Sequence, residues 1–304
     1  MKSRILLEKN TLWKAVLQTS EKALQAGAQF PIPTEYEFIE DAGMWFFVRI
    51  LASIRKKAEE KQKQQASEIA GTSVNPFLPY DKALYVTDIS DSHIALLNKY
   101  NVVDHHLLIV TRHFEDQEVL LTISDFEALW ACMDEYNSLG FYNGGEAAGA
   151  SQRHKHLQMV PLPLAPEGPE VPIEPLFTEA RFRGIMGTIP AFPFRHVFIR
   201  LENDPVDSPY EAARRSFDLY ASSLVHLEMT PPDKGPLKRQ SAPYCFLLAR
   251  KWMLLVPRSK EFCDSISINA LGFTGALLVR NKEQMDLLKE HGPMNVLRSV
   301  GTPI

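Results

Sequence analysis

The segment NGGEAAGASQRHKHLQ, residues 143–158, is the most informative part of this sequence and sets our expectation for the whole fold. Its end and the apolar residues that follow it predict a strand. Alternate side chains of a strand point to the same face, so His154, His156 and Gln158 share one face and Lys155 lies on the other. Three polar side chains in a row are costly to bury without partners. We therefore expect them to form the floor of a polar site.

The loop before this strand is rich in small residues. Gly144, Gly145 and Gly149 precede Ser151. Glycine allows a positive φ and a close approach of the backbone, so amides can converge on an anion. A glycine-rich loop beside two imidazoles predicts a phosphate group held next to a nucleophile or a metal ion.

The H-x-H pattern alone leaves a catalytic, a metal-binding and a structural reading open. Two histidines on one strand face can bind zinc, but a metal site needs further ligands. His105, His106 and His113 are the candidates, and their spacing matches no zinc pattern. On these residues alone a metal-binding or structural origin stands level with a catalytic one, and we assign no metal ligands.

The rest of the chain alternates strand and helix patterns. For helix 124–140 we expect a capping box of Ser124 and Glu127 and a stop at Gly140. Helices are predicted at 11–26, 124–140, 209–229 and 284–290. Strands are predicted at 43–51, 83–89, 93–100, 105–112, 141–143, 154–162 and 196–202, with a hairpin of 244–250 and 252–258. The run 55–68 is highly charged and predicts a solvated helix or connector.

Prolines divide the chain into two parts. Six of them fall between Pro161 and Pro175, the strongest linker signal in the sequence. We expect an N-terminal region of residues 1–165 that carries the H-x-H-x-Q pattern, a linker of residues 161–175, and a C-terminal region of residues 176–304.

The composition is that of an ordinary globular protein. The chain has 304 residues, is 45% hydrophobic and carries a formal net charge of −4. That charge gives no support to nucleic-acid binding, and no apolar run is long enough for a membrane span. The three cysteines form no CxxC pair, and the N-terminus lacks a signal-peptide core. We expect a cytoplasmic protein with reduced thiols.

The segment resembles the histidine triad superfamily, in the transferase branch where H-x-H-x-Q replaces three alternating histidines. The residues at the spacing of nucleotidylyl transferases are Asn143, Gly149, Ser151, His154, His156 and Gln158. Upstream, Asn98 stands at the ribose position and His106 at the histidine of the usual Pro-Gly-His, with Asp104 and His105 replacing Pro-Gly.

Within that branch the chain resembles the ATP adenylyltransferase family, also called diadenosine tetraphosphate phosphorylases. Three separated segments carry the resemblance in order: NPFLPYD at residues 75–81, GASQRHKHLQ at 149–158 and RKWMLLVPRSKEF at 250–262. The resemblance implies an α+β fold, with a histidine-triad-like antiparallel sheet flanked by helices and extended by the C-terminal α+β half.

The resemblance also implies a reaction. His156 attacks the α-phosphorus of diadenosine tetraphosphate, and inorganic phosphate then releases ADP from the adenylyl-histidine. ATP is the first leaving group, and the overall reaction is reversible. His154 orients the nucleophile or holds phosphate, and Gln158 donates to the phosphate oxygens. The further nucleotide- and phosphate-binding residues implied are Asn98, Asn143, Gly149, Ser151, Gln152, Lys57 and Asn75. For the lysine that meets the polyphosphate, Lys56 stays open as the alternative to Lys57.

Several readings stay open beside this one. No cofactor is required by the family's reaction, and any Mg²⁺ would come with the polyphosphate substrate. Phe77 fits a core role as well as base stacking, and Arg258, Ser259 and Lys260 fit either a phosphate site or a solvated turn. The alternative functions are a hexose-1-phosphate uridylyltransferase, a dinucleoside polyphosphate hydrolase and a non-catalytic nucleotide sensor. The oligomeric state is left open.

Overall fold

The computed structural model describes residues 4–51, 75–201, 208–230 and 238–304. The charged run 55–68 and the predicted phosphate-binding Lys57 lie outside the described residues. In the described part of the chain, no helix combines the length and apolar character that crossing a membrane requires.

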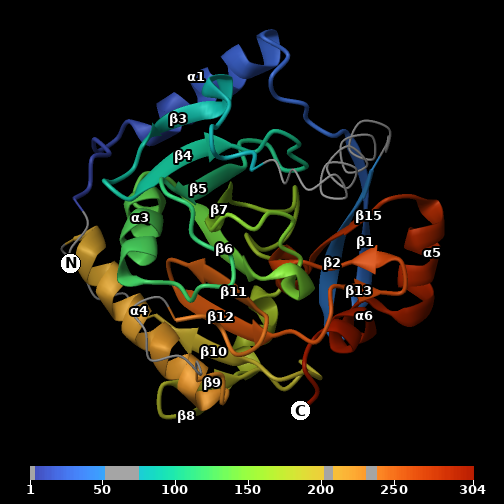
Figure 1. The fold of residues 1–304 in the computed structure, drawn as a ribbon. Coiled ribbons are helices and arrows are strands. Elements are labelled where there is room, and N and C mark those ends of the chain that lie inside the picture. Colours follow the sequence, from blue (N-terminus) through green and yellow to red (C-terminus); the bar gives the residue numbers. More distant parts are fainter. Residues whose placement is uncertain (1–3, 52–74, 202–207, 231–237) are drawn as a thin grey trace, which may run out of the picture.

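A ten-stranded antiparallel sheet forms the centre of the molecule (Figure 1), in the order β3-β4-β5-β7-β6-β11-β12-β10-β9-β8. The strands of the first half are β3 (Tyr85–Asp88), β4 (His93–Leu97), β5 (Leu107–Thr111), β6 (Ser138–Gly144) and β7 (His156–Pro161). Those of the second half are β8 (Arg181–Arg183), β9 (Met186–Thr188), β10 (Val197–Arg200), β11 (Tyr244–Ala249) and β12 (Trp252–Pro257). The two halves join where β6 pairs with β11.

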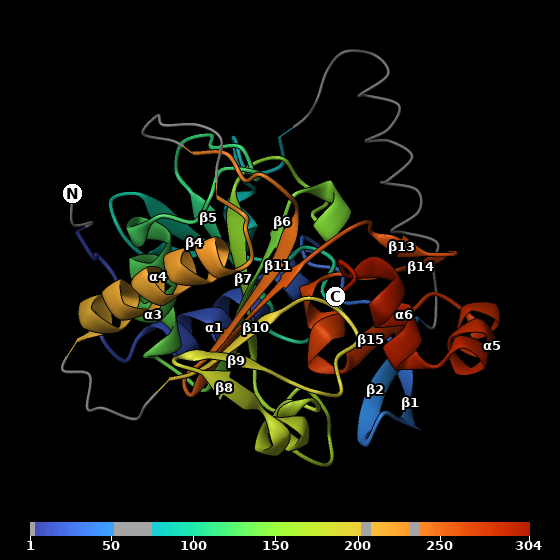
Figure 2. The same ribbon diagram turned by 90° about the horizontal axis from the view of Figure 1, so that it is seen from below.

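One face of this sheet is covered by helices (Figures 1 and 2). They are α1 (Leu12–Gln25), α3 (Ile123–Met133) and α4 (Pro209–His226). The core between them and the sheet includes Leu129 of α3, Leu157 of β7 and Phe246 of β11, all at most 1% exposed. Burial of such apolar side chains stabilises the fold by roughly 1.5 to 3 kcal/mol for each.

The opposite face of the sheet carries a second layer. It contains a small sheet of β1 (Thr34–Asp41), β2 (Met44–Leu51) and β15 (Ala276–Val279), in which β15 runs parallel to β2. Helices α5 (Lys282–His291) and α6 (Pro293–Val300) and the short hairpin β13 (Phe262–Cys263) and β14 (Ile266–Ser267) lie on the same side (Figure 2). Phe141 and Val160 of the large sheet pack into this layer. The expected α+β fold, with an antiparallel sheet extended by the second half, is confirmed.

The proline-rich segment is packed into the protein and does not act as a free linker. Leu164, Val171 and Ile173 are at most 4% exposed and belong to the core beneath the second layer. The reason is that apolar residues alternate with the prolines, which the proline count alone conceals. The segment therefore connects two parts of one continuous core.

Helix α3 is shorter than the predicted helix 124–140. It ends at Met133, and its capping box is formed by Thr122 and Asp125, two residues before the predicted Ser124 and Glu127. Gly140 does not stop the helix but lies inside β6, where the Leu129 side chain occupies the space of a Cβ atom. The helical spacing of apolar residues correctly predicts a helix here, but the predicted C-terminal end of that helix is wrong.

The other predicted elements are largely present. The hairpin of β11 and β12 has the expected position, and α1 and α4 match their predicted ranges within a few residues. The final predicted helix is α5, which begins after the N-cap Asn281, and the sequence reasoning missed α6. Pro293 starts α6 directly after Gly292, so one continuous apolar pattern is divided between two helices.

The turn between β4 and β5 explains the unusual Asp104-His105 pair. His105 has a φ of 57°, the left-handed conformation that a glycine adopts more easily. Its ring meets Trp13 of α1 edge to face, with 5.3 Å between ring centroids. Packing against α1 thus holds a histidine in a conformation that glycine adopts more easily.

His196 makes the stability of this fold dependent on pH. Its Nε2 accepts a hydrogen bond from the Ile189 N–H at 2.7 Å, and its Nδ1 donates to the Phe194 carbonyl at 2.8 Å. Burial lowers the pKa of His196 from 6.5 to about 4. Between these values the unfolded chain binds the proton and the folded chain does not. Stability is therefore fully present above pH 6.5 and falls as the pH approaches 4.

When the pH is lowered from 7 to 5, we expect the free energy of unfolding to fall by on the order of 2 kcal/mol because of His196. Urea unfolding of the protein and of His196→Gln at both pH values measures this contribution. The variant should lose less stability on acidification than the unmodified protein, because glutamine does not titrate. Equal losses in the two proteins would contradict the assignment.

Candidate active site

The H-x-H-x-Q side chains lie on the face of the sheet opposite α1 and α3. His156 begins β7 opposite Val110 of β5, and Gln158 pairs with Leu108 of β5 and Phe141 of β6. Leu108 and Val110 belong to a small apolar cluster with Phe77, and Phe141 belongs to the core of the second layer. The predicted polar face is therefore flanked by two apolar clusters.

The backbone fixes the tautomer of His156. Its Nδ1 lies 2.8 Å from the carbonyl oxygen of His154, which can only accept, so Nδ1 carries the proton. Nε2 then holds the lone pair. Burial lowers the pKa of His156 from 6.5 to about 4. At neutral pH the ring is an uncharged base with one nitrogen available for attack.

His154 has both ring nitrogens engaged. Nε2 donates to the Thr111 carbonyl at 2.8 Å and lies 2.9 Å from the Thr111 hydroxyl oxygen. Nδ1 then accepts from the side-chain amide of Asn75 at 3.0 Å. Burial lowers the pKa of His154 below 6.5. A neutral ring with two fixed partners suits an orienting role better than proton transfer.

Gln158 contrasts with the two histidines. It is partly exposed, and its side chain makes no hydrogen bond to any of the described residues. Its amide is thus available to donate to a ligand on the same face as His156 Nε2.

Gln117 and Thr111 support the histidines and were missed by the sequence reasoning. The Gln117 Oε1 accepts from the His156 N–H at 2.9 Å, and its Nε2 donates to the carbonyls of Asn143 at 2.9 Å and His156 at 3.2 Å. Gln117 is 2% exposed. Both residues lie about forty positions before the motif, so no local spacing reveals them. The pairing of β5 with β7 brings Thr111 close, and the bridge between Asp116 and His154 brings Gln117 close.

The turn at residues 75–80 covers the two imidazoles. Besides holding His154, Asn75 accepts the Phe77 N–H at 2.9 Å through its Oδ1. The Phe77 ring lies 5.6 Å from the His154 ring and 5.3 Å from the His156 ring, measured between centroids. Asn75, predicted as a nucleotide-binding residue, lies beside His154, and Phe77 is a buried neighbour of both histidines.

The glycine-rich loop is anchored by the second half of the chain. A Cβ atom at Gly149, where φ is 92°, would lie 2.9 Å from Cβ of Asn269. Asn143 reaches the same segment, because its side-chain oxygen accepts the Ala270 N–H at 2.8 Å. Glycine is thus required at position 149 both by its conformation and by the close approach of the second half.

Hydrogen bonds inside this loop reduce the number of its donors that a ligand could use. The Gly149 N–H donates to the Glu146 carbonyl at 2.8 Å, within the loop. Ser151 is exposed and Gln152 is half-buried, and within the described part of the chain neither side chain has a hydrogen-bond partner. Of the predicted phosphate-binding residues here, Ser151 and Gln152 are therefore the ones with available donors.

Asn98 lies on the same face, further along the sheet. Its side-chain amide contacts His106 Nδ1 at 3.2 Å, and its Oδ1 accepts the Tyr100 N–H at 3.0 Å. It follows β4, whereas Gln158 lies two strands away on β7. Asn98 therefore lies at the end of β4, on the side of Gln158 that is nearer the edge strand β3.

Arg258 is a structural residue and does not form part of a phosphate site. Arg258 is 2% exposed, and its guanidinium donates to the main-chain carbonyls of Val300, Ala148, Lys260 and Ile268. Its donors are therefore committed to the protein. The contact with Ala148 joins the glycine-rich loop to the C-terminal segments.

A metal centre finds no support among the described residues, since they contain no group of three or more His, Cys, Asp and Glu side chains placed to hold an ion. Both ring nitrogens of His154 are already engaged, so the H-x-H pair does not present two free ligands.

Comparison with known families covers nearly the whole chain. Residues 2–179 match the family model described as Ap4A phosphorylase N-terminal domain, and residues 190–303 match that of the ATP adenylyltransferase C-terminal domain. Diadenosine 5′,5‴-P1,P4-tetraphosphate phosphorylase 2 of Saccharomyces cerevisiae is 28% identical over 240 residues, 71% of this chain and 72% of the relative. Protein APA1 of the same yeast is 27% identical over 229 residues, 68% of each chain.

Solved structures agree in fold. The crystal structure of yeast Ap4A phosphorylase Apa2 superposes with a TM-score of 0.76 at 23% identity, over 98% of this chain and 99% of that one. Apa2 in complex with Ap4A gives a TM-score of 0.75 at 23% identity, with the same coverage. The antiparallel sheet and its covering layers are thus shared along the whole chain.

Proposed function

The chain belongs to the Ap4A phosphorylase / ATP adenylyltransferase family, and we propose that it cleaves diadenosine tetraphosphate (Ap4A) with inorganic phosphate to ATP and ADP. The observation that carries this proposal is the state of His156. Its proton is held on Nδ1 by the His154 carbonyl, so Nε2 presents its lone pair on the polar face of β7.

In the first step the Nε2 lone pair attacks the α-phosphorus of one adenylyl group. The N–P bond forms as the bond to the bridging oxygen breaks, and ATP leaves with that electron pair. The imidazole becomes cationic, and its Nδ1–H bond to the His154 carbonyl is then charge-assisted and stronger. Gln158 donates to the non-bridging oxygens and stabilises the charge that develops there.

In the second step an oxygen of inorganic phosphate attacks the adenylyl phosphorus. The new O–P bond forms as the N–P bond breaks, and the electron pair returns to Nε2. ADP is released and His156 is again neutral. Because the chemistry is nearly symmetric, the same residues support the reverse reaction from ADP and ATP.

Binding of the nucleotides is proposed for the residues around this centre. The related Apa2 was crystallised with AMP and with Ap4A, which supports AMP and Ap4A as ligands of this chain too. Ser151, Gln152 and Lys57 would hold the polyphosphate, Gly149 would permit the loop geometry, and Asn98 would contact the ribose. Asn75 and Asn143 would act chiefly by holding His154 and the loop.

The proposal includes the setting of the reaction. The three cysteines are free and buried, in accord with a reducing compartment such as the cytoplasm. No cofactor takes part in the two transfers. Any Mg²⁺ would arrive bound to the polyphosphate substrate, where it neutralises charge.

Product analysis with and without phosphate tests the function. With Ap4A and phosphate we expect equal amounts of ATP and ADP, and little turnover when phosphate is omitted. ATP and AMP formed without phosphate would instead identify a hydrolase. Turnover of UDP-glucose with galactose-1-phosphate, and none of Ap4A, would identify a uridylyltransferase. Binding of Ap4A without any product would identify a sensor.

A further inference from the structure

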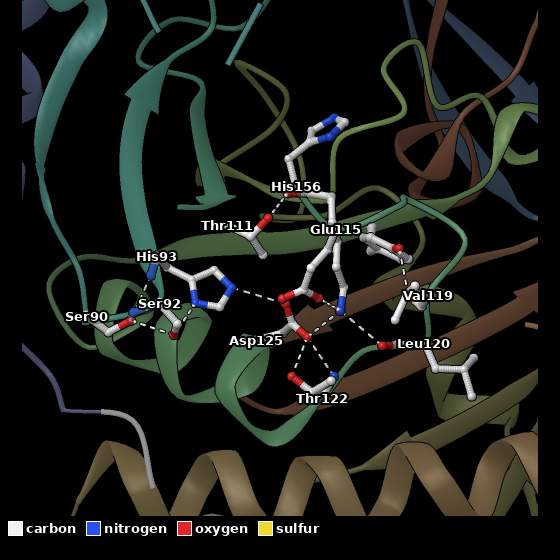
Figure 3. Close-up of polar contacts among 12 residues, drawn as sticks. Ser90, Ser92, His93, Thr111, Glu115, Val119, Leu120, Thr122, Asp125 and His156 are labelled. Carbon is white, nitrogen blue, oxygen red and sulfur yellow. Dashed lines mark hydrogen bonds and ion pairs between the residues drawn. The ribbon is translucent and has the colours of Figure 1, made fainter. Parts of the chain in front are cut away.

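A buried ion pair lies beneath the start of β7, where Lys155 stands between His154 and His156. Lys155 is 0% exposed, and its Nζ donates to Asp125 Oδ2 at 2.7 Å, to the Leu120 carbonyl at 3.0 Å and to Glu115 Oε2 at 3.3 Å. All three of its protons are therefore used. Figure 3 shows Asp125 and Glu115 on one side of the strand, with the His156 ring on the other.

Asp125 is itself held in place from several sides. Its Oδ2 also accepts from the Thr122 N–H at 2.6 Å and from the Thr122 hydroxyl at 2.7 Å, as the capping box of α3. Its Oδ1 lies 3.1 Å from His93 Nε2 (Figure 3). The ion pair thus joins β7 to the start of α3 and to β4. A charged pair at this depth is not required for stability, since apolar pairs often serve equally well.

The peptide unit between His154 and Lys155 connects this pair to the nucleophile. Its carbonyl is the one that holds the Nδ1 proton of His156, at 2.8 Å. Its N–H donates to the Glu115 carbonyl at 2.8 Å, and the Glu115 carboxylate contacts the Lys155 ammonium. The next carbonyl, that of Lys155, accepts from the Thr111 N–H at 3.2 Å and from the Thr111 hydroxyl at 3.3 Å. Rotation of this peptide would move the acceptor away from His156.

We propose that Lys155, paired with Asp125, is a positioning residue that fixes the His154–Lys155 peptide and thereby keeps Nε2 of His156 unprotonated and aimed at the α-phosphorus. The sheet separates its ammonium from the polar face, so it acts on the reaction only through the backbone. The proposal rests on His156 as the nucleophile, and it assigns a reason for a lysine in the middle of H-x-H.

Two variants separate positioning from stability. Lys155→Met leaves the Asp125 carboxylate buried without its cation, so a lower Tm is expected together with slower catalysis. Lys155→Met combined with Asp125→Asn removes both charges, so Tm should recover most of the loss. We expect kcat per folded enzyme to stay about 10²-fold below that of the unmodified enzyme in both variants, with KM for Ap4A changed less than about threefold.

The tautomer of His156 gives a readout that does not depend on turnover. In protein labelled with ¹⁵N in histidine, the His156 ring should show a protonated Nδ1 and a bare Nε2, assigned by comparison with His156→Gln. In both Lys155 variants a second set of signals, with the proton on Nε2, is expected. Leu129→Ala in α3 is the matched control, because it removes a fully buried side chain without touching this peptide, and should lower Tm with kcat unchanged.

Recovery of kcat together with Tm in the double variant, or an unchanged His156 tautomer in both, would overturn the proposal. Failure of the proposed function looks different, because the unmodified enzyme would then form no ATP and ADP from Ap4A while the tautomer result still stands.

Discussion

Replacing His156 with alanine is expected to lower the turnover of Ap4A by at least about 10⁴-fold, since no other described side chain offers an imidazole lone pair on the polar face of β7. His154, two residues earlier, has both nitrogens occupied by Thr111 and Asn75 and does not replace it. Nucleotide binding should change little, because the phosphate and ribose contacts come from other residues. Steady-state assays and calorimetric titration with Ap4A measure the two quantities.

The fold should tolerate this change. Among the described residues, the ring of His156 bonds only to the carbonyl of His154, and it packs against Phe77. An unaltered circular dichroism spectrum therefore serves as the control. His156→Gly with added imidazole supplies a free nucleophile in the vacated space, and partial recovery of turnover is expected. Full activity of His156→Ala would disprove the assignment of the nucleophile.

Replacing Gln158 with alanine is expected to slow formation of the adenylyl-histidine by about 10² to 10³-fold, the usual cost of losing one donor to a developing oxyanion. The amide of Gln158 makes no hydrogen bond within the described residues, so it is available to donate on the face that carries His156 Nε2. Quenched-flow detection of the labelled adenylyl-enzyme measures the step directly. Gln158→Glu keeps the shape but loses the N–H donors and adds a negative charge, so it should be at least as slow as alanine.

Gln158→His tests why this chain has glutamine at the third position. An imidazole there can move a proton, whereas an amide cannot. We expect the histidine variant to hydrolyse the adenylyl-histidine with water and to lower the ratio of phosphorolysis to hydrolysis. An unchanged ratio of ADP to AMP, measured at fixed phosphate, would show that glutamine does not protect the intermediate. Retention of the native rate by Gln158→Ala would contradict its role in the first step.

Much of this architecture follows from local patterns. The alternation in residues 154–158 places the three polar side chains on one face, and the apolar periodicity predicts α1, α3 and α4. These features depend on neighbours in sequence. The C-terminal boundary of α3 does not follow from neighbours in sequence. Gly140 resembles a helix stop, but it lies inside β6, where the Leu129 side chain packs on it.

The residues that hold the two histidines in place are brought to them by strand pairing. They could therefore not be predicted from the sequence. Gln117 and Thr111 look like ordinary loop and strand-end residues. Their bonds to the histidines follow from the pairing of β5 with β7 and from the bridge between Asp116 and His154. Arg258 was open between a phosphate site and a solvated turn, and its burial among carbonyls decides against both. Lys155 could be assigned to the opposite face of the strand, but not to Asp125, which lies thirty positions earlier in the sequence.

The pairing of β6 with β11 has a consequence for how the chain can be divided. In the intact protein β6 is an inner strand, bonded to β7 on one side and to β11 on the other. A fragment that ends at residue 179 would leave one whole side of β6 without hydrogen-bond partners, and its apolar residues uncovered. Such an open edge is a template for joining other chains. The two regions that match the family models therefore share one sheet, and a fragment holding only one of them would expose a strand edge that the intact protein keeps paired.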